Sequence, residues 1–266
     1  MTYDMPTLMF LDRPDGSKIA YHAIPRKQTA TPNEQKPGIL FLGGFMSDMT
    51  GTKATHFEEH CARRGLAYTR FDYSGHGQST GHFADGTIGQ WAKDAIAVLD
   101  HVATGPQILV GSSMGGWISL LTALARPDRI GGLIGVAAAP DFTEDLMWAR
   151  FSDTQKQTIE ETGALIEPTE YGDDPYTITR TLIVEARNHL LLRTPINLTF
   201  PVRLVQGMQD PDVPWQTALK LADKLTSNDV EVHLIKSGDH RLSKADELAA
   251  ITHHIDMLAG CAPSDG

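Results

Sequence analysis

Residues 108–117 read Ile-Leu-Val-Gly-Ser-Ser-Met-Gly-Gly-Trp, a short stretch that few folds can accommodate. Its apolar start predicts a buried strand, and the apolar residues that follow, as far as Leu124, recur at helical spacing. Gly111 and Gly115 stand two residues before and after Ser113. This pattern predicts a sharp strand-to-helix turn at Ser113, because side chains at the two glycine positions would collide with neighbouring backbone.

A serine held in such a turn exposes its hydroxyl above the sheet, where it can act as a nucleophile. Ser112 does not fit the pattern, because the corresponding positions are Val110 and Met114. A serine hydroxyl is a poor nucleophile at neutral pH, so Ser113 needs a general base and a third group that orients the base. We therefore look for a histidine and an acid at the same edge of the sheet.

Composition excludes several other classes of protein. The 266 residues are 41% hydrophobic, enough for a sizeable core, and 33 acidic residues outnumber 23 basic ones, so the net charge is −10. We therefore expect no nucleic-acid partner, and no apolar run is long enough for a membrane span. Cys61 and Cys261 lie far apart, and residues 1–7 lack the pattern of a targeting signal, which predicts a cytoplasmic protein.

Buried strands alternate with amphipathic helices along most of the chain. Strands are expected at residues 8–11, 18–24, 38–42, 66–71, 107–110, 132–137, 202–206 and 230–235. Helices are expected at residues 55–65, 87–103, 117–124, 215–225 and 245–258. The alternation predicts an α/β fold with a parallel sheet covered on both faces, whose strand ends share one ligand-binding edge.

The alternation of strands and helices stops between residues 140 and 194, where helices alone are expected, at 142–151, 153–162 and 179–192. A stretch with Gly and Pro, residues 167–176, separates the second helix from the third. We expect residues 140–194 to form a helical lid inserted into a core made of residues 1–139 and 195–266. Its apolar side chains suit an acyl site or plain packing equally well, so no substrate-binding residue is predicted.

The partners of Ser113 are expected just beyond the last two strands. Asp210 follows the seventh expected strand, and His240 follows the eighth. We predict that His240 is the general base and that Asp210 orients it, because the order Ser, acid, His is the one that a sheet of this kind requires. Asp212, two residues on, and Asp141, after the sixth strand, are the alternatives to Asp210.

The oxyanion of an acyl-transfer intermediate needs preorganised N–H donors. One is expected from the backbone of Met114, at the start of the helix after Ser113. The other is expected from Phe45, in the loop after the third strand, where Gly43 and Gly44 keep the backbone open. No Gly-rich phosphate-binding motif and no metal-ligand spacing is present, so neither a nucleotide cofactor nor a metal is predicted.

With the turn, the acid and the histidine in this order, the chain resembles the α/β-hydrolase superfamily over nearly its whole length. Five stretches resemble its branch of mitochondrial palmitoyl-protein thioesterases and mycophenolic acid acyl-glucuronide esterases, namely residues 51–54, 70–75, 105–117, 213–215 and 239–241. The resemblance implies an eight-stranded α/β-hydrolase fold and cofactor-free hydrolysis of acyl esters or thioesters, of small molecules or acylated proteins, through an acyl-serine. Ser113, Asp210 and His240 match the triad of that branch.

Two other functions stay open at this point. The same scaffold carries carbon–carbon bond hydrolases and aminopeptidases, and it also carries binding proteins that keep the pocket and lose catalysis. Such binding proteins commonly lack a member of the triad, whereas all three residues are present in this chain. The sequence does not indicate the oligomeric state.

Overall fold

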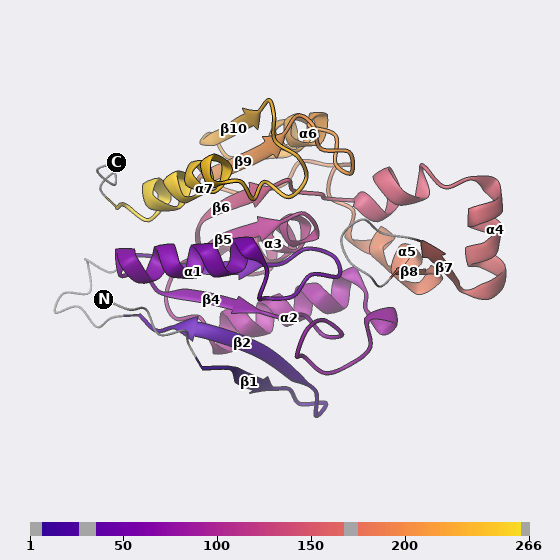
Figure 1. Cartoon of the computed structure of the whole chain (residues 1–266), viewed down its shortest axis with the longest axis horizontal. Helices are drawn as coiled ribbons and strands as arrows, with labels where there is room; N and C mark the ends of the chain where they lie inside the picture. Colours follow the sequence, from indigo (N-terminus) through magenta and orange to yellow (C-terminus); the bar gives the residue numbers. More distant parts are fainter. Residues whose placement is uncertain (1–6, 27–35, 168–174, 262–266) are drawn as a thin grey trace.

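The computed structural model describes residues 7–26, 36–167 and 175–261. Its centre is an eight-stranded sheet with the order β1-β2-β4-β3-β5-β6-β9-β10 (Figure 1). The strands are β1 (Met9–Asp12), β2 (Lys18–Ile24), β3 (Gly38–Leu42), β4 (Tyr68–Phe71), β5 (Gln107–Ser112), β6 (Ile130–Val136), β9 (Val202–Gly207) and β10 (Val230–Ile235). β1 and β2 pair antiparallel, as do β2 and β4, and every pairing from β4 to β10 is parallel. The predicted α/β fold with a mostly parallel sheet is confirmed.

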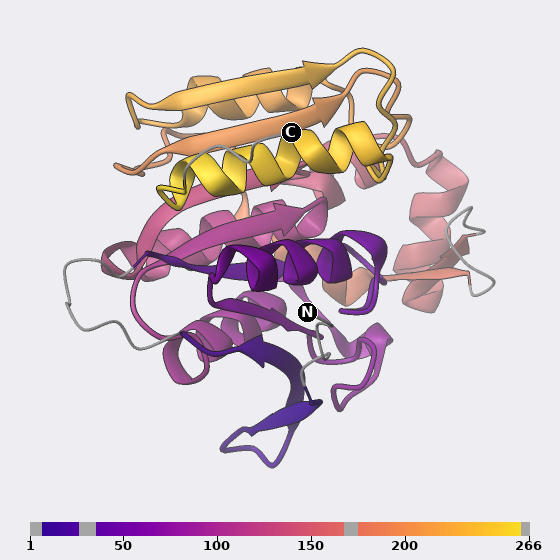
Figure 2. The same ribbon diagram turned by 60° about the vertical axis from the view of Figure 1, so that its left-hand side comes forward.

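Helices cover both faces of this sheet (Figure 2). They are α1 (Thr52–Arg64) and α7 (Ala245–Leu258) on one face, and α2 (Ile88–His101), α3 (Met114–Ala125) and α6 (Gln216–Lys224) on the other. Phe57 and Ile255 lie in the core of the first face, and Trp91 and Trp117 lie in the core of the second. Every residue of β3, β5 and β9 is buried between the two layers, which explains the continuous apolar runs in β3 and β5.

The segment between β6 and β9, residues 137–201 and hereafter the inserted segment, stands to one side of the sheet, beyond its carboxyl edge (Figure 1). It contains a π-helical segment (Thr143–Trp148), α4 (Asp153–Thr162), β7 (Ala164–Glu167), β8 (Tyr176–Thr179), α5 (Arg180–Ala186) and a 3₁₀ helix (Arg187–His189). The expectation of helices alone fails here, because β7 and β8 form an antiparallel pair. Most of the predicted Gly- and Pro-containing stretch, residues 168–174, lies outside the described residues.

The direction of the strands decides where the candidate residues lie. β3, β5, β9 and β10 run parallel, so the loops that follow them meet at one edge of the sheet. These loops carry Phe45, Ser113, Asp210 and His240. Within the three described ranges, no helix has the length and apolar character needed to cross a membrane.

Candidate active site

Ser113 occupies the turn between β5 and α3 in a strained conformation. Its φ is 54° and its ψ is −118°, in a region that residues other than glycine rarely adopt. A Cβ atom at Gly111 would collide with the carbonyl oxygen of Gly115, and a Cβ atom at Gly115 would collide with the carbonyl oxygen of Leu42. The two glycines are therefore required by contact with backbone, as the sequence pattern predicts.

His240 links the serine to a carboxylate. Its Nε2 atom lies 3.1 Å from Ser113 Oγ, and its Nδ1 atom lies 2.8 Å from Asp210 Oδ2. An ionised carboxylate can only accept, so Nδ1–H donates to Asp210 and leaves Nε2 to accept the hydroxyl proton of Ser113. The structure thus brings the three predicted residues into one hydrogen-bonded chain, the geometry that makes a serine hydroxyl nucleophilic.

The Asp210 side chain is completely shielded from solvent, and its oxygens are held by several donors. The backbone N–H groups of Asp212 and Val213 both donate to Oδ1 at 2.9 Å, and Gln206 Nε2 donates to Oδ2 at 2.9 Å. Burial alone would raise the pKa of this carboxyl. The hydrogen bond and the charge of His240, with the two backbone donors, outweigh burial and lower the pKa of Asp210. The carboxylate therefore stays ionised beside the imidazole.

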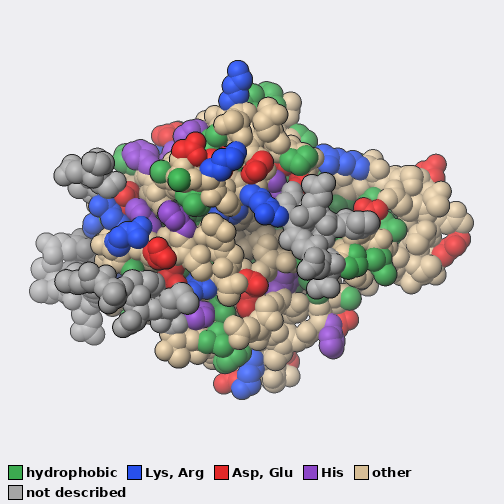
Figure 3. Space-filling model, viewed as in Figure 1, with side chains coloured by type: hydrophobic (Ala, Val, Ile, Leu, Met, Phe, Trp, Pro, Cys, Tyr) green, Lys and Arg blue, Asp and Glu red, His purple; other side chains and the backbone are tan. Residues whose placement is uncertain are grey.

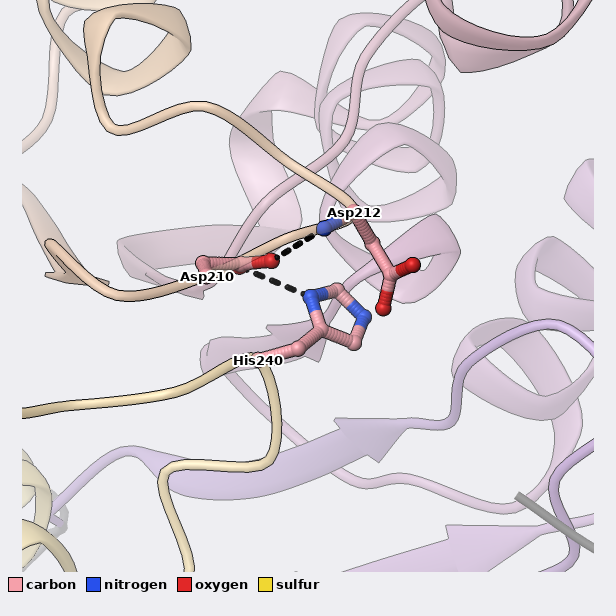
Figure 4. A group of neighbouring side chains, drawn as sticks. All are labelled: Asp210, Asp212 and His240. Carbon is pink, nitrogen blue, oxygen red and sulfur yellow. Dashed lines mark hydrogen bonds and ion pairs between the residues drawn. The ribbon is translucent and has the colours of Figure 1, made fainter. Parts of the chain in front are cut away.

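The two alternative acids occupy different places. Asp212 lies next to the pair, and Figure 4 shows that its backbone nitrogen, not its carboxylate, holds Asp210. Asp141 accepts the N–H groups of Leu191 and Leu192 at 2.8 and 2.9 Å and pairs with Arg193 at 2.9 Å. Asp141 therefore fixes the two ends of the inserted segment to each other.

Asp210, Asp212 and His240 also offer ligand atoms that lie within 4.8 Å of one another, as a metal site would require. In this group, Asp210 Oδ2 already accepts the Nδ1–H of His240, and Asp210 Oδ1 accepts two backbone N–H groups. The hydrogen bonds of the acid–histidine pair account for the grouping without an ion.

The loop after β3 passes over Ser113. A Cβ atom built on Gly44 would lie 3.5 Å from Ser113 Cβ, so the backbone of this loop approaches the serine closely. Within the described parts of the chain, neither Phe45 N–H nor Met114 N–H donates a hydrogen bond to another protein group. Two unused N–H groups, one in the loop that approaches Ser113 and one in the residue that follows it, suit an oxygen that develops negative charge.

A cavity of about 600 Å³ opens onto Ser113 and His240. The inserted segment contributes apolar side chains to its wall, among them Phe142, Leu146, Met147 and Tyr176. Lys53, at the start of α1, lies on another part of the wall and donates to the carbonyl oxygen of Arg241. Burial lowers the pKa of Lys53 to about 8, and the cavity wall also carries the carboxylates of Asp48 and Asp212, so it combines apolar and charged surface.

A buried histidine that the sequence did not single out, His76, lies beside this site. Its side chain packs against Tyr73, Phe83 and Trp91, with ring centroids 5.6, 5.2 and 5.2 Å away. Burial lowers its pKa to about 4, and the nearby carbonyl of Ser74 only partly opposes that shift. His76 is therefore neutral at physiological pH.

The low pKa of His76 predicts a pH-dependent loss of stability. Between pH 6.5 and about 4 the unfolded chain binds a proton that the folded chain does not, so the unfolding free energy falls as the pH falls. Chemical denaturation measures the unfolding free energy of the wild type and of His76→Gln. Between pH 7 and roughly 4.5, we expect the unfolding free energy of the wild type to fall by about 2 to 3 kcal/mol more than that of His76→Gln. Equal losses of unfolding free energy in the two proteins would contradict the low pKa of His76.

Known proteins match this chain over most of its length. Residues 34–181, more than half of the chain, match a family model described as Serine aminopeptidase, S33. The chain is 44% identical to the Mus musculus protein named palmitoyl-protein thioesterase ABHD10, mitochondrial, over 95% of this chain and 82% of that protein.

Two solved structures agree. The mouse alpha/beta hydrolase domain-containing protein 10 has a TM-score of 0.85 and 42% identity, covering 95% of this chain and 98% of that one. A putative hydrolase from Agrobacterium vitis S4 has a TM-score of 0.87 and 38% identity, covering 96% of this chain and 98% of that one.

The chain therefore belongs to the α/β-hydrolase family, and it is a serine hydrolase. These matches confirm the predicted family, fold and enzyme class. The expected cytoplasmic location is wrong, since the mouse relative is named as a mitochondrial protein. Cys61 and Cys261 are free thiols, which suit any reducing compartment, and a targeting signal is independent of the folded domain.

Proposed function

We propose that Ser113, His240 and Asp210 are the catalytic triad, and that the N–H groups of Phe45 and Met114 form the oxyanion hole. The observation that carries this proposal is the hydrogen-bonded chain from Asp210 through His240 to Ser113, which faces the cavity. The close approach of the loop after β3 to Ser113 supports the second part.

The reaction proceeds in two stages on these groups. Ser113 Oγ attacks the acyl carbon while His240 Nε2 takes the hydroxyl proton, and Asp210 stabilises the imidazolium. The tetrahedral oxyanion accepts hydrogen bonds from Phe45 and Met114. His240 then donates its proton to the departing thiolate or alkoxide, which leaves an acyl ester on Ser113. A water molecule, deprotonated by His240, attacks this ester, and the carboxylic acid is released with Ser113 restored.

The substrate is an acyl ester or thioester, with a long acyl chain on a thiol as the preferred form. The mouse relative is named as a palmitoyl-protein thioesterase, and its sequence matches this chain over 95% of the length. The apolar side chains that the inserted segment places on the cavity wall suit an acyl chain. Residues 140–194 act in this proposal as a lid that selects the acyl group, on the core of residues 1–139 and 195–266.

The face of the molecule seen in Figure 3 carries charges of both signs. Lys and Arg side chains are interspersed with Asp and Glu over this face, which has the inserted segment at its right-hand end. Such a mixed surface suits a soluble acylated substrate, a small molecule or an acylated protein, better than a polyanion.

The test of this function is hydrolysis of acyl-CoA thioesters, S-acyl peptides and p-nitrophenyl esters of graded chain length. We expect kcat/KM to rise with chain length, since each buried methylene contributes about 0.8 kcal/mol. Leu146→Trp, which fills the cavity wall, should lower kcat/KM for chains of about twelve carbons or more by roughly tenfold and spare acetyl substrates.

The matched control for this test is Leu219→Trp, because Leu219 is 44% exposed on α6 and lies outside the cavity wall. A cavity that serves the acyl chain predicts different profiles for the two variants. Identical chain-length profiles in Leu146→Trp, Leu219→Trp and wild type would contradict the placement of the acyl chain.

An aminopeptidase is the second candidate, because the matching family model carries that description and two carboxylates, Asp48 and Asp212, line the cavity. A carboxylate there would bind the substrate α-ammonium group. Turnover of aminoacyl p-nitroanilides with no turnover of esters or thioesters would favour it. A folded protein that refuses a fluorophosphonate label would instead favour a non-catalytic binding role.

A further inference from the structure

The loop after β4 holds the loop that passes over Ser113. Three hydrogen bonds join them: Tyr73 Oη donates to the carbonyl oxygen of Gly43 at 3.5 Å, Met46 N–H donates to His76 Nε2 at 3.3 Å, and Met49 N–H donates to Asp72 Oδ1 at 2.7 Å. These contacts are spaced along residues 43–49, hereafter the oxyanion loop. They fix its backbone at the start, the middle and the end.

The middle contact falls on a strained residue. Met46 has a φ of 54°, a left-handed conformation that a methionine adopts only when its surroundings impose it. The peptide plane between Phe45 and Met46 carries the N–H that His76 accepts. Loss of that acceptor would let this peptide rotate toward a relaxed conformation, and the preceding Phe45 backbone would turn with it.

The surroundings of His76 keep its Nε2 atom as a hydrogen-bond acceptor. Its Nδ1 lies 3.3 Å from the carbonyl oxygen of Ser74, so Nδ1 carries the proton and Nε2 presents its lone pair to Met46. The side chain is only 4% exposed, and its depressed pKa keeps Nε2 unprotonated in the neutral range. Phe83 and Trp91, which pack against His76, also pack against the ring of Phe45, with centroids 4.8 and 5.9 Å away.

We propose that His76 is a positioning residue for the reaction: by accepting Met46 N–H it holds the oxyanion loop in its strained form and directs Phe45 N–H at the developing oxyanion. The inference rests on the proposed function, since it concerns the donor that Phe45 supplies. His76 acts through the loop and touches no reacting atom. Replacing His76 should reduce the stabilisation of the transition state. The affinity of the enzyme for the acyl chain of the substrate should not change.

Two variants separate this role from plain packing. His76→Phe keeps an aromatic ring among Tyr73, Phe83 and Trp91 but has no acceptor for Met46. His76→Gln can place an amide oxygen near the position of Nε2 and restore the acceptor. His82→Phe is the control, because His82 lies on the same loop with an exposed side chain.

Because one oxyanion-hole donor contributes about 10²- to 10³-fold in rate, we expect His76→Phe to lower kcat by about 10- to 100-fold with KM changed by less than about threefold. His76→Gln should recover to within about fivefold of wild type, and His82→Phe should match wild type. Affinity for a trifluoromethyl ketone with the same acyl chain, whose adduct carries an oxyanion, should fall in parallel with kcat/KM. Affinity for the product fatty acid should not change.

Several outcomes would overturn the role of His76. One is a folded His76→Phe with wild-type kcat and analogue affinity, another is a loss confined to KM, and a third is a folded His76→Gln as impaired as His76→Phe. If the wild type labels with fluorophosphonate but hydrolyses no ester or thioester, the proposed substrate is wrong. The role of His76 is then tested by comparing the rate at which Ser113 is labelled in the wild type and in the three variants. A wild type that neither labels nor turns over would overturn both proposals.

Discussion

Replacing Ser113 by alanine should lower kcat/KM for the best acyl thioester by about 10⁴-fold or more. A loss of this size is expected because the nucleophile and its general base contribute to the rate together, so removal of the nucleophile abolishes the contribution of both. The oxyanion donors and the cavity stay in place, so KM and the melting temperature should change little. Steady-state kinetics on the purified variant measures the loss.

The control for this variant is Ser112→Ala. Ser112 is the neighbouring serine, but Val110 and Met114, not glycines, stand two residues before and after it, and it belongs to β5. Its replacement should lower kcat/KM by less than about tenfold. Equal losses in the two variants would mean that the turn, and not the hydroxyl of Ser113, is what activity requires.

Replacing Asp210 by asparagine should lower kcat by about 10³- to 10⁴-fold, the second largest loss we expect. The carboxylate accepts the Nδ1–H of His240, and an amide that turns its NH₂ toward the ring would favour the opposite tautomer. Nε2 would then carry a proton and could not accept the one on Ser113. Loss of the negative charge would also destabilise the imidazolium.

Asp212→Asn is the matched test, because Asp212 lies two residues away and donates its backbone N–H to Asp210. That N–H survives the substitution, so kcat should fall by less than about tenfold. A larger loss in Asp212→Asn than in Asp210→Asn would transfer the role of the acid to Asp212 and reverse our assignment.

The positions of these residues could be predicted because local rules fix them. The need for glycine at positions 111 and 115 follows from contacts of the turn with its own surroundings, so the pattern alone singles out Ser113. Asp210 and His240 follow β9 and β10, and parallel strands bring the residues after their carboxyl ends to one edge. Chain order and strand direction were therefore sufficient to place a histidine and an acid beside Ser113, whereas the choice of Asp210 over Asp212 rests on the hydrogen bonds of the structure.

Long-range contacts explain what the sequence did not predict. A helix was expected over residues 55–65, but α1 begins at Thr52, and Thr55 donates its hydroxyl to the Gly51 carbonyl. Glu58 of this helix forms a buried ion pair with Arg70 of β4 at 2.8 Å. Such a pair depends on the packing of two elements and leaves no local pattern.

Long-range contacts also determine structure in the inserted segment and beside the oxyanion loop, and the sequence does not reveal them. β7 and β8 are four residues each and have little amphipathic signal, so only their mutual pairing identifies them. His76 is one of eleven histidines, and nothing in the sequence marks it as the one that accepts Met46 N–H. Its position depends on how the loops after β3 and β4 pack together.

Mass spectrometry of the acyl-enzyme tests directly whether Ser113 is the nucleophile. Wild-type protein is mixed with a long-chain acyl-CoA, quenched in acid within milliseconds, digested and mapped, with Asp210→Asn and Ser113→Ala in parallel. The proposed mechanism predicts one acyl adduct on the peptide that contains Ser113, formed in the wild type and absent from Ser113→Ala. Turnover without any adduct on that peptide, or an adduct that persists on another residue in Ser113→Ala, would contradict it.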